Sequence, residues 1–284
     1  ICSKSSLLKS VSISLKAVPS KTTMPILECI LMDATTNQIK FTTNDMELGI
    51  ETIVEGTIEE KGMVALDAKI FYEIIRRLPD NDITIKTDEK YTATITCEKA
   101  KFNIPGKSGE DFAYLPMIEK DEPLTISQYT LKEMIRQTIF SIAVNENNKL
   151  MTGELFEVHN NEFKVVSLDG HRISIRKIEL KDSYPDRKVI VPGKSLQEVS
   201  KILSGETEDE VRIFFTGNHI VFEFDNTIVV SRLIEGEYFK INQMLSSDYE
   251  TKFVINKKEM LSCIDRATLL VKEGDKKPIV FRIT

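Results

Sequence analysis

The chain has 284 residues, 41% of them hydrophobic and 29% charged, with a formal net charge of −6. These are ordinary values for a globular protein, and the length allows about two domains and a substantial core. No apolar run approaches the ~18 residues of a membrane span and no signal peptide is visible, so we expect a cytoplasmic protein without a membrane partner. The chain begins at Ile1 and not at Met, which predicts that a few residues precede it.

The sequence contains no motif for metal, cofactor or nucleophilic chemistry. The four cysteines, Cys2, Cys29, Cys97 and Cys263, are far apart and form no CxxC, which favours buried free thiols. The three histidines show no metal-ligand spacing, and no GxGxxG, Walker A or GxSxG segment occurs. We therefore expect neither a metal nor a cofactor.

An amphipathic helix pattern opens the chain and returns twice. It occupies residues 4–18, 130–144 and 257–271, and aligning Leu8, Ile135 and Leu261 gives spacings of 127 and 126 residues. An apolar strand follows each copy, at 25–34, 149–158 and 278–284. The chain is therefore built from repeats.

Two further segments repeat at nearly the same interval. Strands around 41–50 and 165–174 align at Asp45 and Asp169, 124 residues apart, and second helices align at Lys69 and Lys194, 125 residues apart. Period-two runs at 83–104 and 211–234 are typical of half-buried antiparallel strands. The predicted fold class is α+β, with repeated domains that each pack two helices on antiparallel sheets.

The repeat predicts three domains, at 1–117, 118–246 and 247–284. The third contains only one helix and one strand of a unit of about 125 residues, so we expect it to be truncated. A lone helix and strand bury their apolar faces poorly.

Positive charge is concentrated on the expected helices. The segments 4–17, 68–78, 130–144, 193–204 and 257–271 hold 13 basic and 5 acidic residues, a balance of +8, so the rest of the chain carries −14. Such segregation lets an acidic protein present a positive surface to phosphates. No base-reading helix and no aromatic platform is visible, so the expected partner is the backbone of a DNA or RNA duplex, bound without sequence preference and weakened by salt.

The segment "VVSLDGHRISIRK" (165–177) invites a second interpretation, a hydrolase that uses Ser167, Asp169 and His171. On a strand these side chains would share one face at steps of about 6–7 Å, which does not form a relay unless Gly170 supplies a turn. The aspartate also occurs in the first repeat, as Asp45, without the other two residues. We therefore expect both aspartates to accept hydrogen bonds at a turn or strand end. A protein scaffold without DNA is a third interpretation.

Nine segments together form a specific pattern. They are "MPILECILMDA" (24–34), "FTTNDMELGI" (41–50), "IFYEIIRRLP" (70–79), "DFAYLP" (111–116), "TGELFE" (152–157), "SLDGHRIS" (167–174), "VIVPGKSL" (189–196), "SRLIEGEY" (231–238) and "IDRATLLVKEG" (264–274). Their order and spacing resemble the bacterial sliding clamp family, the beta subunit of the replicative DNA polymerase. The resemblance implies a non-catalytic processivity factor of three domains, two chains of which close head to tail around duplex DNA. It also implies partners that dock by short peptides, namely the polymerase, the clamp loader and repair proteins.

The resemblance also assigns site residues. Positions that approach DNA in the family match Lys21, Arg76, Asn145, Lys149 and Leu150, although relatives place aromatic residues in the last loop; Lys194, equivalent to Lys69, is a further candidate. The ring interface matches Phe102 and Ile104 on one side and Leu269 and Leu270 on the other. With a truncated third domain we expect only weak self-association and weak peptide binding. The peptide-docking pocket matches Met151, Leu168, Gly170, His171, Arg172 and Ile173.

Overall fold

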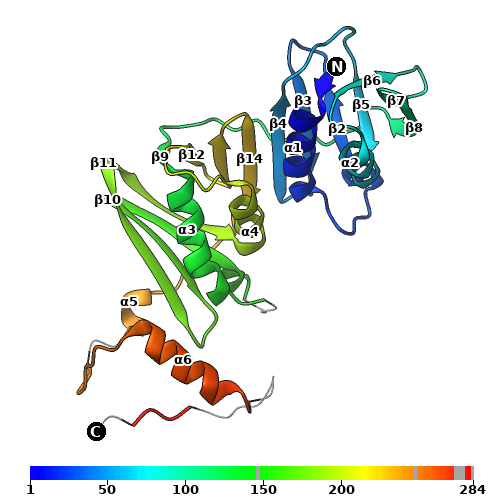
Figure 1. Cartoon of the computed structure of the whole chain (residues 1–284). Coiled ribbons are helices and arrows are strands. Elements are labelled where there is room, and N and C mark those ends of the chain that lie inside the picture. The colour runs from blue at the N-terminus through cyan, green and yellow to red at the C-terminus, as the bar shows by residue number, and fades with distance from the viewer. Residues whose placement is uncertain (145–147, 246–247, 272–278, 283–284) are drawn as a thin grey trace. The chain divides into compact units, whose positions relative to one another are not determined.

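The computed structural model describes residues 1–144, 148–245, 248–271 and 279–282. The chain divides into two units, Ile1–Tyr238 and Phe239–Thr284. All strand pairs are antiparallel and helices pack against them, so the predicted α+β class is confirmed (Figure 1). No helix among the described residues is long and apolar enough to cross a membrane.

The first half of the larger unit, Cys2–Lys107, contains two α-helices and eight strands. Two short 3-10 turns, Leu15–Ala17 and Pro25–Glu28, follow the first helix. The elements are β1 (Cys2–Ser3), α1 (Lys4–Ser14), β2 (Cys29–Asp33), β3 (Ile39–Asn44), β4 (Leu48–Val54), β5 (Met63–Asp67), α2 (Ala68–Arg77), β6 (Asp82–Thr87), β7 (Thr92–Cys97) and β8 (Ala100–Lys107).

The second half, Leu124–Arg232, repeats this plan with longer strands. The 3-10 turns here are η3 (Ile139–Ser141) and η4 (Lys149–Thr152). The other elements are β9 (Leu124–Ser127), α3 (Gln128–Thr138), β10 (Gly153–Leu168), β11 (Ile173–Pro192), α4 (Gly193–Ile202), β12 (Glu210–Phe215), β13 (His219–Phe224) and β14 (Thr227–Arg232).

Side-chain caps explain where the helices begin. Ser3 accepts a hydrogen bond from the Ser6 amide at the start of α1, and Ser127 accepts one from the Thr130 amide at the start of α3. Each cap satisfies one of the amides that a first helical turn leaves unpaired. The helix expected at 130–144 therefore begins two residues earlier, and its last turn is the 3-10 turn η3.

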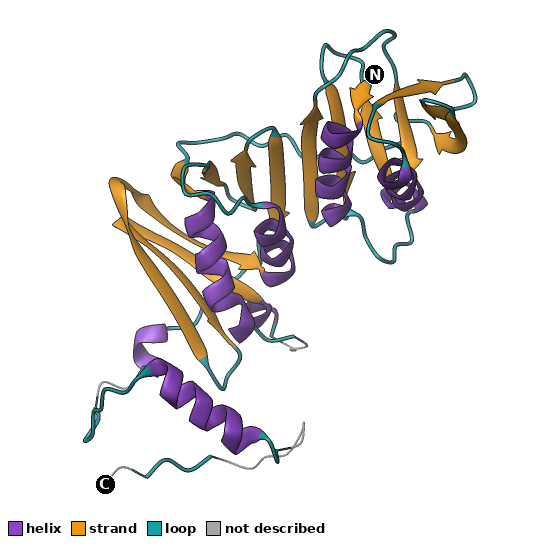
Figure 2. Cartoon of the chain, viewed as in Figure 1, coloured by secondary structure: helices purple, strands orange, loops and turns teal. Residues whose placement is uncertain are grey.

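A continuous sheet joins the two halves. The strand order is β1-β6-β7-β8-β5-β2-β3-β4-β14-β13-β12-β9, and β4 pairs with β14 from Leu48 to Thr52. The long strands β10 and β11 pair with each other. The helices lie side by side in pairs, α1 with α2 and α3 with α4, as Figure 2 shows.

Each half buries its own apolar core. Phe41 and Phe71 meet edge to face at 6.1 Å in the first half, and Phe156 and Phe163 do so at 5.3 Å in the second. Truncating such a ring to alanine costs about 3–5 kcal/mol. Leu48 of the first half packs into the second core, which ties the halves together.

The smaller unit contains α5 (Ile241–Met244) and α6 (Lys257–Thr268), which Asn256 caps. The expected helix is confirmed, but the strand expected over 278–284 is absent from 279–282, and the rest of it lies outside the described residues. A strand needs a neighbouring strand to pair its backbone, and the described part of this unit has none. Cys2, Cys29 and Cys97 are buried free thiols as expected, whereas Cys263 on α6 is exposed.

Candidate functional site

Two of the basic helix residues are structural. The Lys132 ammonium of α3 donates to the Leu203 carbonyl at 2.9 Å, and the Lys4 ammonium of α1 donates to the Leu78 carbonyl. Leu203 and Leu78 are the C-cap residues of α4 and α2. A cation there donates to a carbonyl that the helix leaves unpaired, and it interacts favourably with the negative end of the helix dipole. The count of helix charges therefore overstates the positive surface.

Other helix cations are exposed but paired along their own helix. Arg76 lies 2.8 Å from Glu73, and Arg77 shares that carboxylate at 3.0 Å. The hydrogen bond from Arg76 lowers the pKa of Glu73. On α3, Arg136 holds Glu133 through two hydrogen bonds of 2.7 and 2.6 Å. These exposed pairs contribute little stability, so the guanidiniums are free to exchange the carboxylate for a phosphate.

The loop lysines that are candidates for DNA contact are exposed to solvent. Lys21 is exposed between the 3-10 turns of the first half, and its ammonium forms no ion pair within the described chain. Lys149 is exposed and Leu150 is half-buried in η4, and Leu150 faces Gly236. Asn145 lies outside the described residues.

Lys194 makes a contact that its repeat position did not reveal. Its ammonium lies 2.7 Å from the Asp45 carboxylate, which is only 7% exposed, and this hydrogen bond raises the pKa of Lys194. The pair joins the second half to the first. A DNA-binding role of Lys194 stays a prediction, and a phosphate would have to displace the Asp45 carboxylate from its ammonium.

Both repeat aspartates accept hydrogen bonds in turns, as predicted. Asp45 Oδ1 accepts from the Glu47 and Leu48 amides at 3.0 and 2.7 Å. Asp169 Oδ1 accepts from the His171 and Arg172 amides at 3.1 and 3.2 Å. Burial raises the pKa of Asp169, but these hydrogen bonds and the Arg172 guanidinium outweigh it, and the net shift is downward. A side-chain acceptor of this kind replaces a backbone partner in a tight turn.

The geometry contains no hydrolytic relay. The Ser167 side chain is fully buried, and its hydroxyl donates to the Thr138 carbonyl at 2.6 Å. Asp169 is occupied by the turn and by Arg172, and His171 is exposed beyond it. A nucleophile needs a base within hydrogen-bond reach, and Ser167 has a carbonyl there.

Five of the six predicted docking residues, Leu168, Gly170, His171, Arg172 and Ile173, form the tip of the β10–β11 hairpin, and Met151 lies in η4. Gly170, with φ of +83°, makes the turn, and His171 and Arg172 are exposed beside it. Met151 and Ile173 are half-buried, and Leu168 is fully buried. Leu168 can therefore only support such a pocket from below.

The predicted ring contacts include an unpaired strand edge. In the described chain β8 pairs with β5 only at Gly106 and Lys107, so its stretch 100–104 has a free edge beyond β7. Phe102 on this stretch is 41% exposed, whereas Ile104 is buried. Leu269 and Leu270, just after α6, are 76% and 89% exposed. An open edge beside exposed apolar side chains is suited to pairing with another chain.

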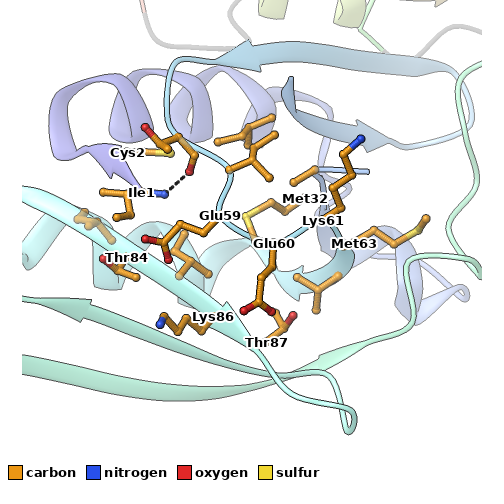
Figure 3. A pocket seen from close by; sticks show the side chains of 18 of the residues that line it. Ile1, Cys2, Met32, Glu59, Glu60, Lys61, Met63, Thr84, Lys86 and Thr87 are labelled. Carbon is orange, nitrogen blue, oxygen red and sulfur yellow. Dashed lines mark hydrogen bonds between the residues drawn. The ribbon is translucent and has the colours of Figure 1, made fainter. Parts of the chain in front are cut away.

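Two cavities lie apart from these residues. One of about 280 Å³ lies in the first half, over Leu7, Phe41 and Ile83. Figure 3 shows its rim of Glu59, Glu60, Lys61 and Lys86, and the hydrogen bond from the Ile1 amino group to the Thr57 carbonyl. Charges of both signs meet at this rim, so it favours neither an anion nor a cation. The second, of about 450 Å³, lies between β11 and residues 233–238.

Comparison with known proteins decides the family. The model of the DNA polymerase III beta subunit N-terminal domain matches residues 1–116, and that of its central domain matches 125–240. A curated beta sliding clamp of Staphylococcus aureus is 34% identical over 92% of this chain and 71% of its own length. The chain belongs to the bacterial beta sliding clamp family.

Solved clamp structures agree with this assignment. A DNA polymerase III beta subunit from Eubacterium rectale is 69% identical, with a TM-score of 0.94 over 96% of this chain and 74% of the other. The Bacillus subtilis sliding clamp is 36% identical, with a TM-score of 0.92 over the same shares. The clamp is a non-catalytic processivity subunit of the DNA polymerase, which confirms that interpretation and leaves no support for the hydrolase.

Sequence reasoning missed two side chains of the clamp. Glu154 on β10 is fully buried, and neither of its oxygens has a hydrogen-bond partner among the described residues. Burial raises its pKa to about 8. Phe140 is 57% exposed, and its ring lies 5.7 Å from the Arg172 guanidinium. The alternation of side chains along the strand could have predicted that Glu154 is buried, because it shares a face with Phe156 and Val158.

Proposed function

We propose that this clamp binds duplex DNA through the surface of its helix pairs and, when full length, encircles it as a head-to-tail dimer. Support comes chiefly from the exposed cations of α2 and α3, which recur in both halves of an otherwise acidic chain. The proposed DNA residues are Lys21, Arg76, Lys149, Leu150 and Lys194. The division into domains at 1–117, 118–246 and 247–284 belongs to the same proposal.

The physical basis is contact with phosphates and not with bases. Arg76 and Arg77 point from one helix turn and share one carboxylate, so binding to DNA exchanges an intramolecular partner for a phosphate. Such contacts release counterions and carry no sequence information. They hold a ring loosely around DNA, which suits a protein that slides.

Anisotropy of a labelled duplex at about 50 and 200 mM salt tests this surface. Replacing Lys21 or Arg76 by alanine is expected to weaken binding a few-fold and to lower the salt slope by about 0.9 for each lost contact. Lys61→Ala is the matched control, because Lys61 is exposed in the loop between β4 and β5 and is not a helix residue. Equal effects of all three changes would show that only net charge matters.

The hairpin tip is the proposed docking site for short peptides of the polymerase, the clamp loader and repair proteins. It offers half-buried Ile173 beside exposed Gly170 and His171, and the proposal adds half-buried Met151 of η4 as a second apolar contact. Apolar walls with a few placed polar groups are typical of peptide sites. A labelled peptide from the clamp-binding end of a bacterial replicative polymerase tests it, and Met151→Asp should abolish binding. Binding of the peptide to this variant at wild-type affinity would contradict the proposed docking site.

The ring interface is proposed between the free edge of β8 and the apolar residues after α6. Phe102 supplies the exposed ring on one side, and Leu269 and Leu270 supply the other. Backbone pairing at the edge would satisfy the open N–H and C=O groups of stretch 100–104. The two surfaces differ, as a head-to-tail interface requires.

A further inference from the structure

Arg172 is held on two sides by its own protein. Its Nε donates to Asp169 Oδ2 at 2.9 Å, within the turn that the same aspartate organises. Its guanidinium carbon lies 5.7 Å from the centroid of the Phe140 ring. That separation is within the range of a cation–π contact, and the planar guanidinium satisfies both partners at once.

Phe140 belongs to η3, the turn that ends helix α3, and this turn is tied to the hairpin at two further points. The Ser167 hydroxyl donates to the Thr138 carbonyl, and the Ser141 and Ser174 hydroxyls lie 2.6 Å apart. Ser167 and Ser174 are paired residues at the base of the hairpin tip. The base is thus fixed by buried or half-buried hydrogen bonds, while beyond it, among the described residues, Arg172 makes the contact that holds the tip to η3.

The turn at the tip is open. Gly170 adopts φ of +83°, and apart from its chain neighbours no described residue lies within 4 Å of where its Cβ would be. His171 and Arg172 are exposed. A glycine turn in open solvent is conformationally permissive, so its orientation depends on restraints made by its neighbours.

We infer that Arg172 is a positioning residue and not a peptide contact: held between Asp169 and Phe140, it sets the direction in which Gly170 and His171 face a docked peptide. The inference rests on the proposed docking role of the hairpin. It adds Phe140, which no peptide has to touch, to the residues that control partner affinity.

Peptide affinity of the 284-residue chain tests this arrangement, with the labelled polymerase peptide as probe. Phe140→Leu keeps an apolar side chain without the ring, and Arg172→Lys keeps the positive charge without the planar guanidinium. Each is expected to weaken binding about three- to tenfold, and the double variant no more than about twofold further, because both remove one contact. Phe140→Tyr should retain the affinity. Tyr129→Leu is the control, since Tyr129 is an exposed aromatic residue on the same helix.

A direct peptide contact predicts a different pattern. Arg172→Lys would then weaken binding while Phe140→Leu left it unchanged, and that result would overturn the inference. Amide hydrogen exchange at His171 and Arg172 in the free protein gives a second readout. Phe140→Leu should accelerate it and Tyr129→Leu should not. If the wild-type chain bound no peptide, the docking proposal would fail, yet exchange would still decide whether Phe140 positions the tip; unchanged exchange would refute that role.

Discussion

Glu154 should make the stability of the clamp depend on pH in an unusual direction. The carboxyl group is fully buried on β10, without a hydrogen-bond partner among the described residues. An unpaired buried charge is expensive, so the folded protein keeps the acid protonated. Its pKa in the fold is about 8, against an ordinary value of 4.5.

The direction follows from these two values. Below pH 4.5 both folded and unfolded chains hold the proton, and the contribution to stability is fully present. As pH rises, the unfolded chain releases the proton first, so the free energy of unfolding falls by about 1.4 kcal/mol per pH unit until pH 8. The total loss across the window is about 5 kcal/mol.

Urea unfolding of the wild type and of Glu154→Gln at about pH 5.5 and 7.5 measures this effect. Gln has the same shape and no charge, so the cost of its buried amide is the same at both pH values. The stability of the variant relative to the wild type should rise by about 2–3 kcal/mol between them. Exposed Glu206→Gln should show no such change. A change for Glu154→Gln below about 0.5 kcal/mol would mean that the buried carboxyl is ionised or hydrated.

Three further predictions follow from the contacts. Lys132→Met should lower the free energy of unfolding by about 1–2 kcal/mol in urea and leave duplex affinity unchanged; weaker DNA binding at unchanged stability would make Lys132 a phosphate contact. Asp45→Asn keeps the turn acceptor but releases Lys194, and duplex binding should tighten about twofold in anisotropy; unchanged affinity would place Lys194 away from DNA. Phe102→Asp should weaken self-association at least tenfold in sedimentation equilibrium, about the effect expected of an interface aromatic; an unchanged constant would remove the β8 edge from the ring interface.

The repeat allowed most of the fold to be predicted, because each helix and strand recurs with its own periodicity. The turn role of Asp45 and Asp169 followed from the same comparison and is confirmed by their amide hydrogen bonds. Local pattern could not show which lysines face solvent. Lys4 and Lys132 look like surface cations in the sequence, yet each caps a helix that begins more than 60 residues later.

Contacts between distant segments limited the prediction of the site. Lys194 pairs with a carboxylate 149 residues away, and no local pattern indicates that partner. Phe140 looked like one more apolar residue of an amphipathic helix, but the turn at η3 directs it toward the hairpin. The residues proposed for DNA, ring and peptide contact stay predictions.

Retention on DNA tests the account of a sliding clamp most directly. The full-length protein is loaded onto nicked circular DNA by a bacterial clamp loader, and the complex is passed through gel filtration in high salt. A ring that holds DNA topologically stays with the circle and is released when a restriction enzyme linearises it. Equal retention on circular and linear DNA, or loss from both, would contradict the account.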